Sequence, residues 1–262
     1  MKAALLLLAL SLLLPAAAAR SDGGVGYEQR IGESLPLGTV LTDAQGRERP
    51  LGALLAGRPA VLIFTYFRCP EMCSLVASGA VESLRTLKAT AGADYEVITV
   101  SIDPSDTAAM AREREHQDLG RYGRRGAAAG WHTLVGREDQ VAALAAAAGF
   151  RYRFDPRSRQ YAHPSGLVVL TPRGVVSRYF LGVDFPATDL AEALKAAAAN
   201  QTGSSVFSLL LVCFQGGAQQ GQYSRLVWIA LWAGVLATLG AVFGGIAWML
   251  GQERRRLMGG AP

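Results

Sequence analysis

The stretch Ala60-Val61-Leu62-Ile63-Phe64-Thr65-Tyr66-Phe67-Arg68-Cys69-Pro70-Glu71-Met72-Cys73 decides the fold class of this chain. Its first eight residues, 60–67, form an apolar run that is typical of a strand buried on both faces of a parallel sheet. Pro70 suits the first turn of a helix, which we expect to continue to Leu87. Apolar residues recur along it at spacings of three and four, as in a helix that faces a core: Val76, Ala80, Leu84 and Leu87. A buried strand that runs into such a helix indicates an α/β domain.

The same alternation continues along the chain. Further strands are predicted at 96–102 and 131–135, and further helices at 107–122, 138–148 and 189–199. A hairpin at 35–50 comes first, and a second hairpin joins 166–170 to 175–180. This order predicts a thioredoxin-like α/β domain over residues 35–199 with an N-terminal β-hairpin. The Gly-rich polar stretch 20–34 should form a flexible leader in front of the domain.

The N-terminus has the pattern of a secretory signal peptide. Lys2 precedes an apolar run from Ala3 to Leu14, and small residues follow at 17–19. The apolar run is too short to span a bilayer. We therefore expect residues 1–19 to direct export of the chain.

The C-terminal part contains a second apolar segment. Residues 226–250 carry no charge, and at about 1.5 Å per helical residue they can cross a hydrocarbon core of about 30 Å. Arginines at 254–256 follow, and positive residues favour the cytoplasmic side. We expect a single-pass membrane protein with a juxtamembrane segment at 200–225, a transmembrane helix at 226–250 and a cytoplasmic tail at 251–262. The domain would then be extracytoplasmic, on the periplasmic side in a bacterium.

The distribution of charge argues against nucleic-acid binding. The chain has a formal net charge of +5, yet residues 21–224 contain 20 basic and 20 acidic side chains. The excess positive charge therefore lies at the two ends, whereas a nucleic-acid binder shows a basic face on its folded domain. Half of all residues are hydrophobic, which argues against a disordered chain.

The three cysteines are Cys69, Cys73 and Cys213, an odd number in an oxidising compartment. Cys69 and Cys73 lie where a helix should begin, and a helix N-terminus lowers thiol pKa values. Two thiolates in this position can bind a soft metal ion, and they can also oxidise to a disulfide. Cys213 lies in the apolar run 206–214, where it is either a buried apolar cysteine or a membrane-proximal thiol.

A third ligand for a metal at this cysteine pair would come from a histidine. His116 lies on a charged helix face and His132 enters a predicted strand, so both favour a structural or solvated role. His163 lies in the loop that opens the final hairpin, and a thioredoxin-like fold places that loop against the helix with the cysteines. Together with the cysteine pair, His163 is the favoured ligand.

The sequence resembles the Sco/SenC family of copper-binding, thioredoxin-like proteins. Four pieces carry the resemblance, in consistent order over residues 35–198: the strand 61–67, the motif Cys69-Pro70-Glu71-Met72-Cys73, the turn 100–104 and His163 before the last hairpin. The resemblance implies that Cys69, Cys73 and His163 bind one copper ion. Two thiolates and one imidazole suit Cu(I).

The resemblance also implies a function in assembling the binuclear copper site of cytochrome c oxidase, as a copper carrier, a thiol reductant, or both. The implied partners are the copper-site subunit of a respiratory oxidase or other copper chaperones. The alternative is a thiol–disulfide oxidoreductase that acts through Cys69 and Cys73 alone. Peroxidase chemistry and copper-free redox sensing fit the sequence less well.

Three features depart from the family pattern. Position 162 is Ala, where many members have an acidic residue before the histidine. The expected membrane anchor is C-terminal, whereas better-known members carry an N-terminal one. Cys213 lies outside the motif.

Overall fold

The computed structural model describes residues 24–68, 72–203, 232–240, 242–245, 247, 248 and 251, with only the backbone for 72–75. The chain divides into two compact units, Met1–Ser204 and Ser205–Pro262. The expected signal peptide, Cys69 and Cys213 lie outside the described residues.

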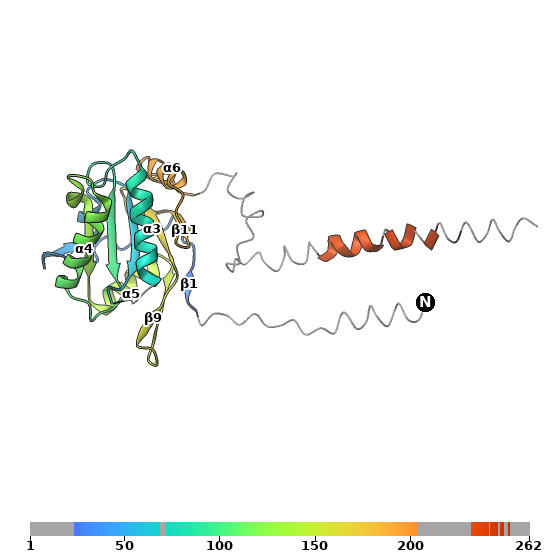
Figure 1. Cartoon of the computed structure of the whole chain (residues 1–262), viewed down its shortest axis with the longest axis horizontal. Helices are drawn as coiled ribbons and strands as arrows, with labels where there is room; N and C mark the ends of the chain where they lie inside the picture. Colours follow the sequence, from blue (N-terminus) through green and yellow to red (C-terminus); the bar gives the residue numbers. More distant parts are fainter. Residues whose placement is uncertain are drawn as a thin grey trace, which may run out of the picture. The chain divides into compact units, whose positions relative to one another are not determined.

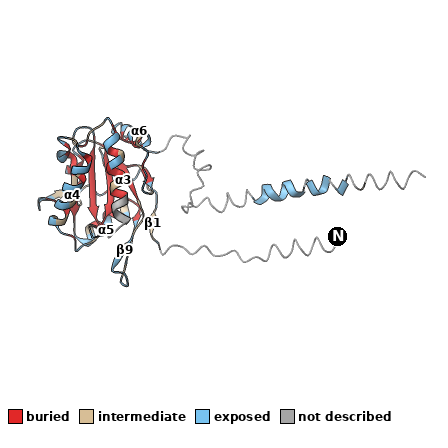
Figure 2. Ribbon diagram, in the orientation of Figure 1, coloured by how far each residue is buried: buried red, intermediate tan, exposed pale blue. Residues whose placement is uncertain are grey.

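A seven-stranded sheet forms the centre of the first unit, in the order β11-β10-β4-β5-β6-β2-β3. The three middle strands β4, β5 and β6 are parallel, and the strands outside them are antiparallel to their neighbours. The bounds are β2 Val40–Asp43, β3 Glu48–Pro50, β4 Ala60–Thr65, β5 Glu96–Ser101, β6 Trp131–Val135, β10 Gly166–Leu170 and β11 Val176–Leu181. All six residues of β4 are buried, as the apolar run predicts (Figure 2).

Helices cover both faces of this sheet. On one face, the core packs β4 and β10 side chains such as Ile63 and Val169 against α3 (Met72–Thr86), α4 (Ala108–Tyr122) and α6 (Ala187–Ala198). On the other, Leu62 and Phe64 meet α2 (Leu51–Leu55) and α5 (Glu138–Ala147). Figure 1 shows α3 beside α4 in front of the strands. The mixed α/β architecture and the β2–β3 hairpin are therefore confirmed.

The segment before the domain is not loose where it is described. β1 (Gly26–Tyr27) pairs with β7 (Phe150–Arg151), and residues 32–35 exchange backbone hydrogen bonds with 174–176 at the start of β11. Leu35 is buried in the core. The expectation of a flexible leader at 20–34 is wrong for residues 26–34, because backbone pairing orders a stretch whose composition is polar and Gly-rich.

The sequence also left several short elements unpredicted. The short helix α2 follows Pro50 directly, and a 3-10 turn η1 (Ala127–Gly130) precedes β6. The strands β8 (Arg153–Asp155) and β9 (Gln160–Ala162) form a two-stranded hairpin outside the main sheet.

In the second unit, the described residues 232–240, 242–245, 247, 248 and 251 are helical. Large apolar side chains are exposed on them, among them Phe243 and Trp248. No helix made of described residues is both long and apolar enough to span a membrane. Parts of 226–250 lie outside the described residues, and the transmembrane helix stays a prediction.

We predict that Gly79→Ala destabilises the domain. A methyl group at Gly79 of α3 would overlap with the backbone oxygen of Val183, in the loop that crosses the helix. Such overpacking costs about 1–3 kcal/mol of unfolding free energy, measurable by urea denaturation. Gly120→Ala in α4 is the matched control, because its methyl group meets nothing within 4 Å and alanine gains up to about 1 kcal/mol over glycine in a helix. If the two substitutions changed the free energy of unfolding equally, the close approach of Val183 O to Gly79 would be contradicted.

We also predict that Asp43→Ala lowers the free energy of unfolding, by an amount that depends on pH. The Asp43 carboxylate closes the β2–β3 hairpin by accepting hydrogen bonds from the backbone N–H groups of Gln45 and Arg47 and from Arg47 Nε, at 2.9–3.0 Å. Burial raises the pKa of this carboxyl, but the three hydrogen bonds and the charge of Arg47 outweigh it, so the pKa lies below its ordinary value.

The folded state thus binds fewer protons than the unfolded state near the carboxyl pKa. The Asp43 contribution is fully present above the unfolded pKa of about 3.9 and is lost as the pH falls through the folded pKa. Asp43→Ala should cost about 1–3 kcal/mol at pH 7 and progressively less in acid, as measured by urea unfolding. An equal cost at pH 7 and at about pH 2 would contradict this assignment.

Candidate metal site

The motif with the cysteines begins where β4 ends. The loop after β4 leads into α3, and the loop after the neighbouring parallel strand β5 leads into α4. Since parallel strands end at the same edge of a sheet, these two loops lie side by side. Open α/β sheets form their functional sites at this edge.

A buried carboxylate joins the two loops. Asp106 Oδ2, in the loop after β5, accepts a hydrogen bond from the backbone N–H of Phe67 at 2.8 Å and from Ser101 Oγ at 2.6 Å. The Asp106 side chain is fully buried. The chain is therefore fixed two residues before Cys69 by a contact that spans 39 positions in sequence.

Arg68 adds a charged contact between the same loops. Its Nε lies 3.5 Å from Asp106 Oδ1, and its Nη2 lies 3.8 Å from Asp103 Oδ2 and donates to Ser105 Oγ. Asp103 also accepts a hydrogen bond from the backbone N–H of Ser105 at 2.8 Å. The Asp103-Pro104 turn singled out in the sequence thus closes the loop after β5 and holds the residue that precedes Cys69.

His163 reaches the same edge from the opposite direction. It lies between β9 and β10, and β10 runs antiparallel to β4. The imidazole ring packs edge-on against Tyr66, with ring centroids 5.8 Å apart, and lies 6.0 Å from the Phe150 ring. The fold therefore places His163 beside a residue only three positions before Cys69.

The environment of His163 sets its protonation. Nδ1 lies 3.0 Å from the carbonyl oxygen of Pro164, and because a carbonyl can only accept, Nδ1 carries the proton. In the neutral ring, Nε2 is then the basic nitrogen. Burial lowers the pKa of His163, while the bond to Pro164 partly offsets that effect. A neutral imidazole with a fixed tautomer is the form that binds a metal ion.

The cysteines themselves are only partly described. Cys69 lies outside the described residues, and Cys73 is described by its backbone alone, in the first turn of α3. Among the described residues, no group of three or more His, Cys, Asp or Glu residues could hold a metal ion. The ligand set Cys69, Cys73 and His163 stays a prediction.

The other two histidines lie away from the sheet edge where β4 and β5 end. His116 is exposed on α4. His132 Nε2 contacts Glu96 Oε2 at 2.9 Å, and Glu96, which is fully buried, also pairs with Arg58. This network joins β5 and β6, which confirms the structural role expected for His132.

Sequence reasoning missed an aromatic cluster around His163. Tyr161 packs against Tyr66 at 5.6 Å and against Tyr152 at 5.9 Å, and Tyr152 lies 5.8 Å from Phe150. With His163, these rings form a closed circle of contacts. The alternation of aromatic residues at 150, 152 and 154 was the available signal, but the partners across the cluster are distant in sequence.

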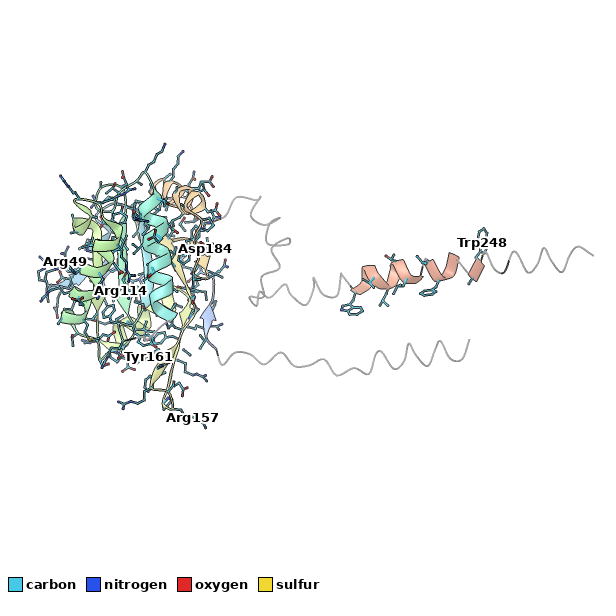
Figure 3. The ribbon with its side chains drawn as sticks, in the orientation of Figure 1. Arg49, Arg114, Arg157, Tyr161, Asp184 and Trp248 are labelled. Atoms are coloured by element: carbon cyan, nitrogen blue, oxygen red, sulfur yellow. The ribbon has the colours of Figure 1, made fainter. Side chains whose placement is uncertain are left out.

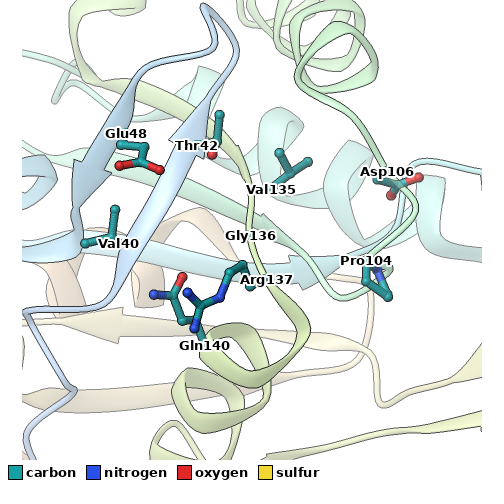
Figure 4. A pocket seen from close by; sticks show the side chains of 9 residues that line it. All are labelled: Val40, Thr42, Glu48, Pro104, Asp106, Val135, Gly136, Arg137 and Gln140. Atoms are coloured by element: carbon teal, nitrogen blue, oxygen red, sulfur yellow. The ribbon is translucent and has the colours of Figure 1, made fainter.

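A pocket of about 510 Å³ opens beside the loop after β5 (Figure 4). Its walls are formed by β2 and β3, by Pro104 and Asp106, and by the chain after β6. His163 does not line it. Of the predicted metal ligands, His163 therefore lies outside this pocket.

We predict that Asp106→Ala destabilises the domain by about 1–3 kcal/mol, because the Phe67 N–H loses its acceptor and Arg68 loses an ion pair. Urea unfolding measures the loss. Asp184→Ala, at an exposed position, is the control and should change stability by less than about 0.5 kcal/mol. If the two variants were equally stable, Asp106 would not hold the loop in place.

Comparison with known proteins gives one family and several solved structures. Residues 40–199 match the model of the SCO1/SenC family. A comparison with curated protein sequences finds no match. A protein of Aquifex aeolicus VF5, provisionally named an electron transfer protein, is 28% identical and has a TM-score of 0.57. The match covers 64% of this chain and 95% of that protein.

Two further structures are Sco proteins. BsSco, described as a member of the Sco family of cytochrome c oxidase assembly proteins with a disulfide switch, is 19% identical with a TM-score of 0.50, over 66% of this chain and 98% of BsSco. ScoI of Arabidopsis thaliana, solved with copper bound, is 16% identical with a TM-score of 0.48, over 62% and 96% of the two chains. The likeness to BsSco confirms the expected thioredoxin-like fold. Since the family model spans most of the folded unit and more than half of the sequence, this chain belongs to the SCO1/SenC family.

Proposed function

We propose that this chain binds one copper ion, as Cu(I), through Cys69, Cys73 and His163, and assists assembly of the copper site of cytochrome c oxidase. The observation that carries the proposal is the placement of His163. Its ring packs against Tyr66 at the edge where β4 leads into the cysteine motif. Its Nδ1 donates to Pro164, which makes Nε2 the basic nitrogen.

The donor set fits copper as a cargo. Two thiolates and one neutral imidazole form a soft, low-coordinate site that favours Cu(I), whereas zinc with three protein ligands usually takes a fourth from water or substrate. The N-terminus of α3 would favour the thiolate form of Cys73. Burial lowers the pKa of His163 and so favours the neutral imidazole. A metal ion then does not have to displace a proton from the ring.

Family membership supports the cellular process. BsSco is described as a member of a family of cytochrome c oxidase assembly proteins, and we extend that process to this chain. We further propose that residues 226–250 tether the chain to a membrane and that the folded unit works outside the cytoplasm. The signal-peptide pattern and the arginines after residue 250 support this placement.

A thiol–disulfide oxidoreductase is the second candidate. The Aquifex protein provisionally assigned to electron transfer, at 28% identity, favours it. In that function, Cys69 and Cys73 would give two electrons and two protons to a partner disulfide, which would become two thiols. His163 would not be needed as a ligand.

We predict that the reduced full-length chain, kept anaerobic in mild detergent, binds one equivalent of Cu(I) in competition with a strong Cu(I) chelator. Cys69→Ser, Cys73→Ser and His163→Ala should each lower the affinity at least about 100-fold, since the loss of even an indirect partner of a metal ligand costs 10–100-fold. His116→Ala, on an exposed face, is the matched control and should bind like the wild type.

Two results would contradict the copper proposal. An unchanged affinity in His163→Ala would remove His163 from the ligand set. Weak Cu(I) binding by the wild type, together with a readily reducible Cys69–Cys73 disulfide, would favour the oxidoreductase.

A further inference from the structure

The β8–β9 hairpin projects from the folded unit next to the predicted metal site. Its strands pair Arg153 with Ala162 and Asp155 with Gln160, in a sheet separate from the seven-stranded one. Figure 3 shows Arg157 at the far end of this projection and Tyr161 near its base. We call residues 151–162, which comprise this hairpin and the two residues before it, the arginine hairpin.

The arginine hairpin concentrates positive charge in a domain whose net charge is zero. Four arginines are exposed within nine positions: Arg151, Arg153, Arg157 and Arg159. Within the described part of the chain, none of the four forms an ion pair with a carboxylate. The only acidic residue of the hairpin is Asp155, whose carboxylate accepts hydrogen bonds from Arg157 N and Ser158 Oγ within the turn. Residues 21–224 have no net charge, so this local excess is a distinct feature.

Apolar side chains accompany the charge. Phe154, on the hairpin, is 45% exposed, with its ring 5.0 Å from Tyr161. Leu181 and Val183 are 37% and 40% exposed. They flank Gly182, whose N–H donates to Ser165 O in the loop that carries His163. Aromatic and arginine side chains are enriched in protein interfaces, where they supply much of the binding energy.

The arginine hairpin is mechanically connected to His163. Its last residue, Ala162, directly precedes the histidine, and ring contacts run from Phe154 through Tyr161 and Tyr66 to His163. A protein that contacts the base of the hairpin, where Ala162 precedes the histidine, would therefore lie beside the imidazole. Such an approach is what transfer between two metal sites requires.

We propose that the arginine hairpin docks an acidic face of the protein that receives copper from this chain. The inference rests on the proposed function, because it names the partner surface for the same site. Complementary charge would steer the acceptor toward the hairpin, and Phe154, Leu181 and Val183 would supply apolar contacts around His163. A folded acidic protein suits this surface better than an anionic membrane, because Phe154 is the one large apolar side chain exposed on the described hairpin, which leaves little apolar surface to insert into a bilayer.

The test measures transfer of Cu(I) from the full-length chain to the copper-free soluble copper-site domain of the oxidase from the same organism. Stopped-flow rates are recorded between about 20 mM and about 300 mM salt, because salt screens steering between exposed charges. Arg157→Glu/Arg159→Glu should slow association at least about tenfold at low salt and abolish its salt dependence. The matched control is Lys88→Glu/Lys195→Glu, which makes the same change of charge at exposed lysines beside the α3 and α6 ends, near Pro59. It should transfer like the wild type.

The Cu(I) affinity of each variant is measured in parallel and should be unchanged. If the wild type binds no Cu(I), the proposed function fails, whereas docking is still tested by the affinity of the metal-free chain for the same domain. Equal transfer rates for the arginine and lysine variants would overturn the docking proposal. The docking proposal would also be overturned if the arginine variant lost binding to phosphatidylglycerol vesicles while its transfer rate stayed unchanged.

Discussion

The hydrogen bond from the Phe67 N–H to the buried carboxylate of Asp106 is the constraint on which the site depends. β4 and β5 are neighbours in the sheet, but the chains that leave them diverge into different helices. A carboxylate with no exposed surface needs partners, since an unpaired buried charge is expensive. Ser101, Phe67 and Arg68 provide them. Phe67 and Arg68, directly before the cysteine motif, are thereby held against the loop after β5. Such support is what gives a functional site on a loop a fixed geometry.

The parts of the fold that follow from local pattern were predictable. The runs at β4, β5 and β6 are rich in apolar residues because both faces of these strands are covered, and they match the structure to within two residues. Residues 26–34 and the β8–β9 hairpin were not predictable in the same way. Their order comes from pairing with distant or exposed segments, as between β1 and β7, and such pairing leaves no apolar periodicity in the sequence.

The same distinction between local sequence pattern and long-range contacts applies to the candidate site. The spacing of Cys69 and Cys73 and the position of His163 before the last hairpin are visible in the sequence, because each follows from the order of elements. The tautomer of His163 and its aromatic surroundings are not. They depend on a backbone carbonyl at Pro164 and on rings that come from the residue after β4, from β7 and from β9. The sequence also singled out the turn 100–104, which contains Asp103 and Pro104. It did not indicate that Asp106 accepts a hydrogen bond from the neighbouring loop.

The pairing of residues 32–35 with the start of β11 has a consequence for the solubility of the domain. β11 is an edge strand, and open edges of sheets invite pairing between molecules. The N-terminal segment covers one end of this edge through hydrogen bonds to 174–176, and the chain after α6 covers more of it through Gly203 N and Ser177 O. A domain trimmed to begin at residue 36 would keep most of its core and lose part of this cover. The polar stretch before the domain thus covers part of the β11 edge that could otherwise pair with a second molecule.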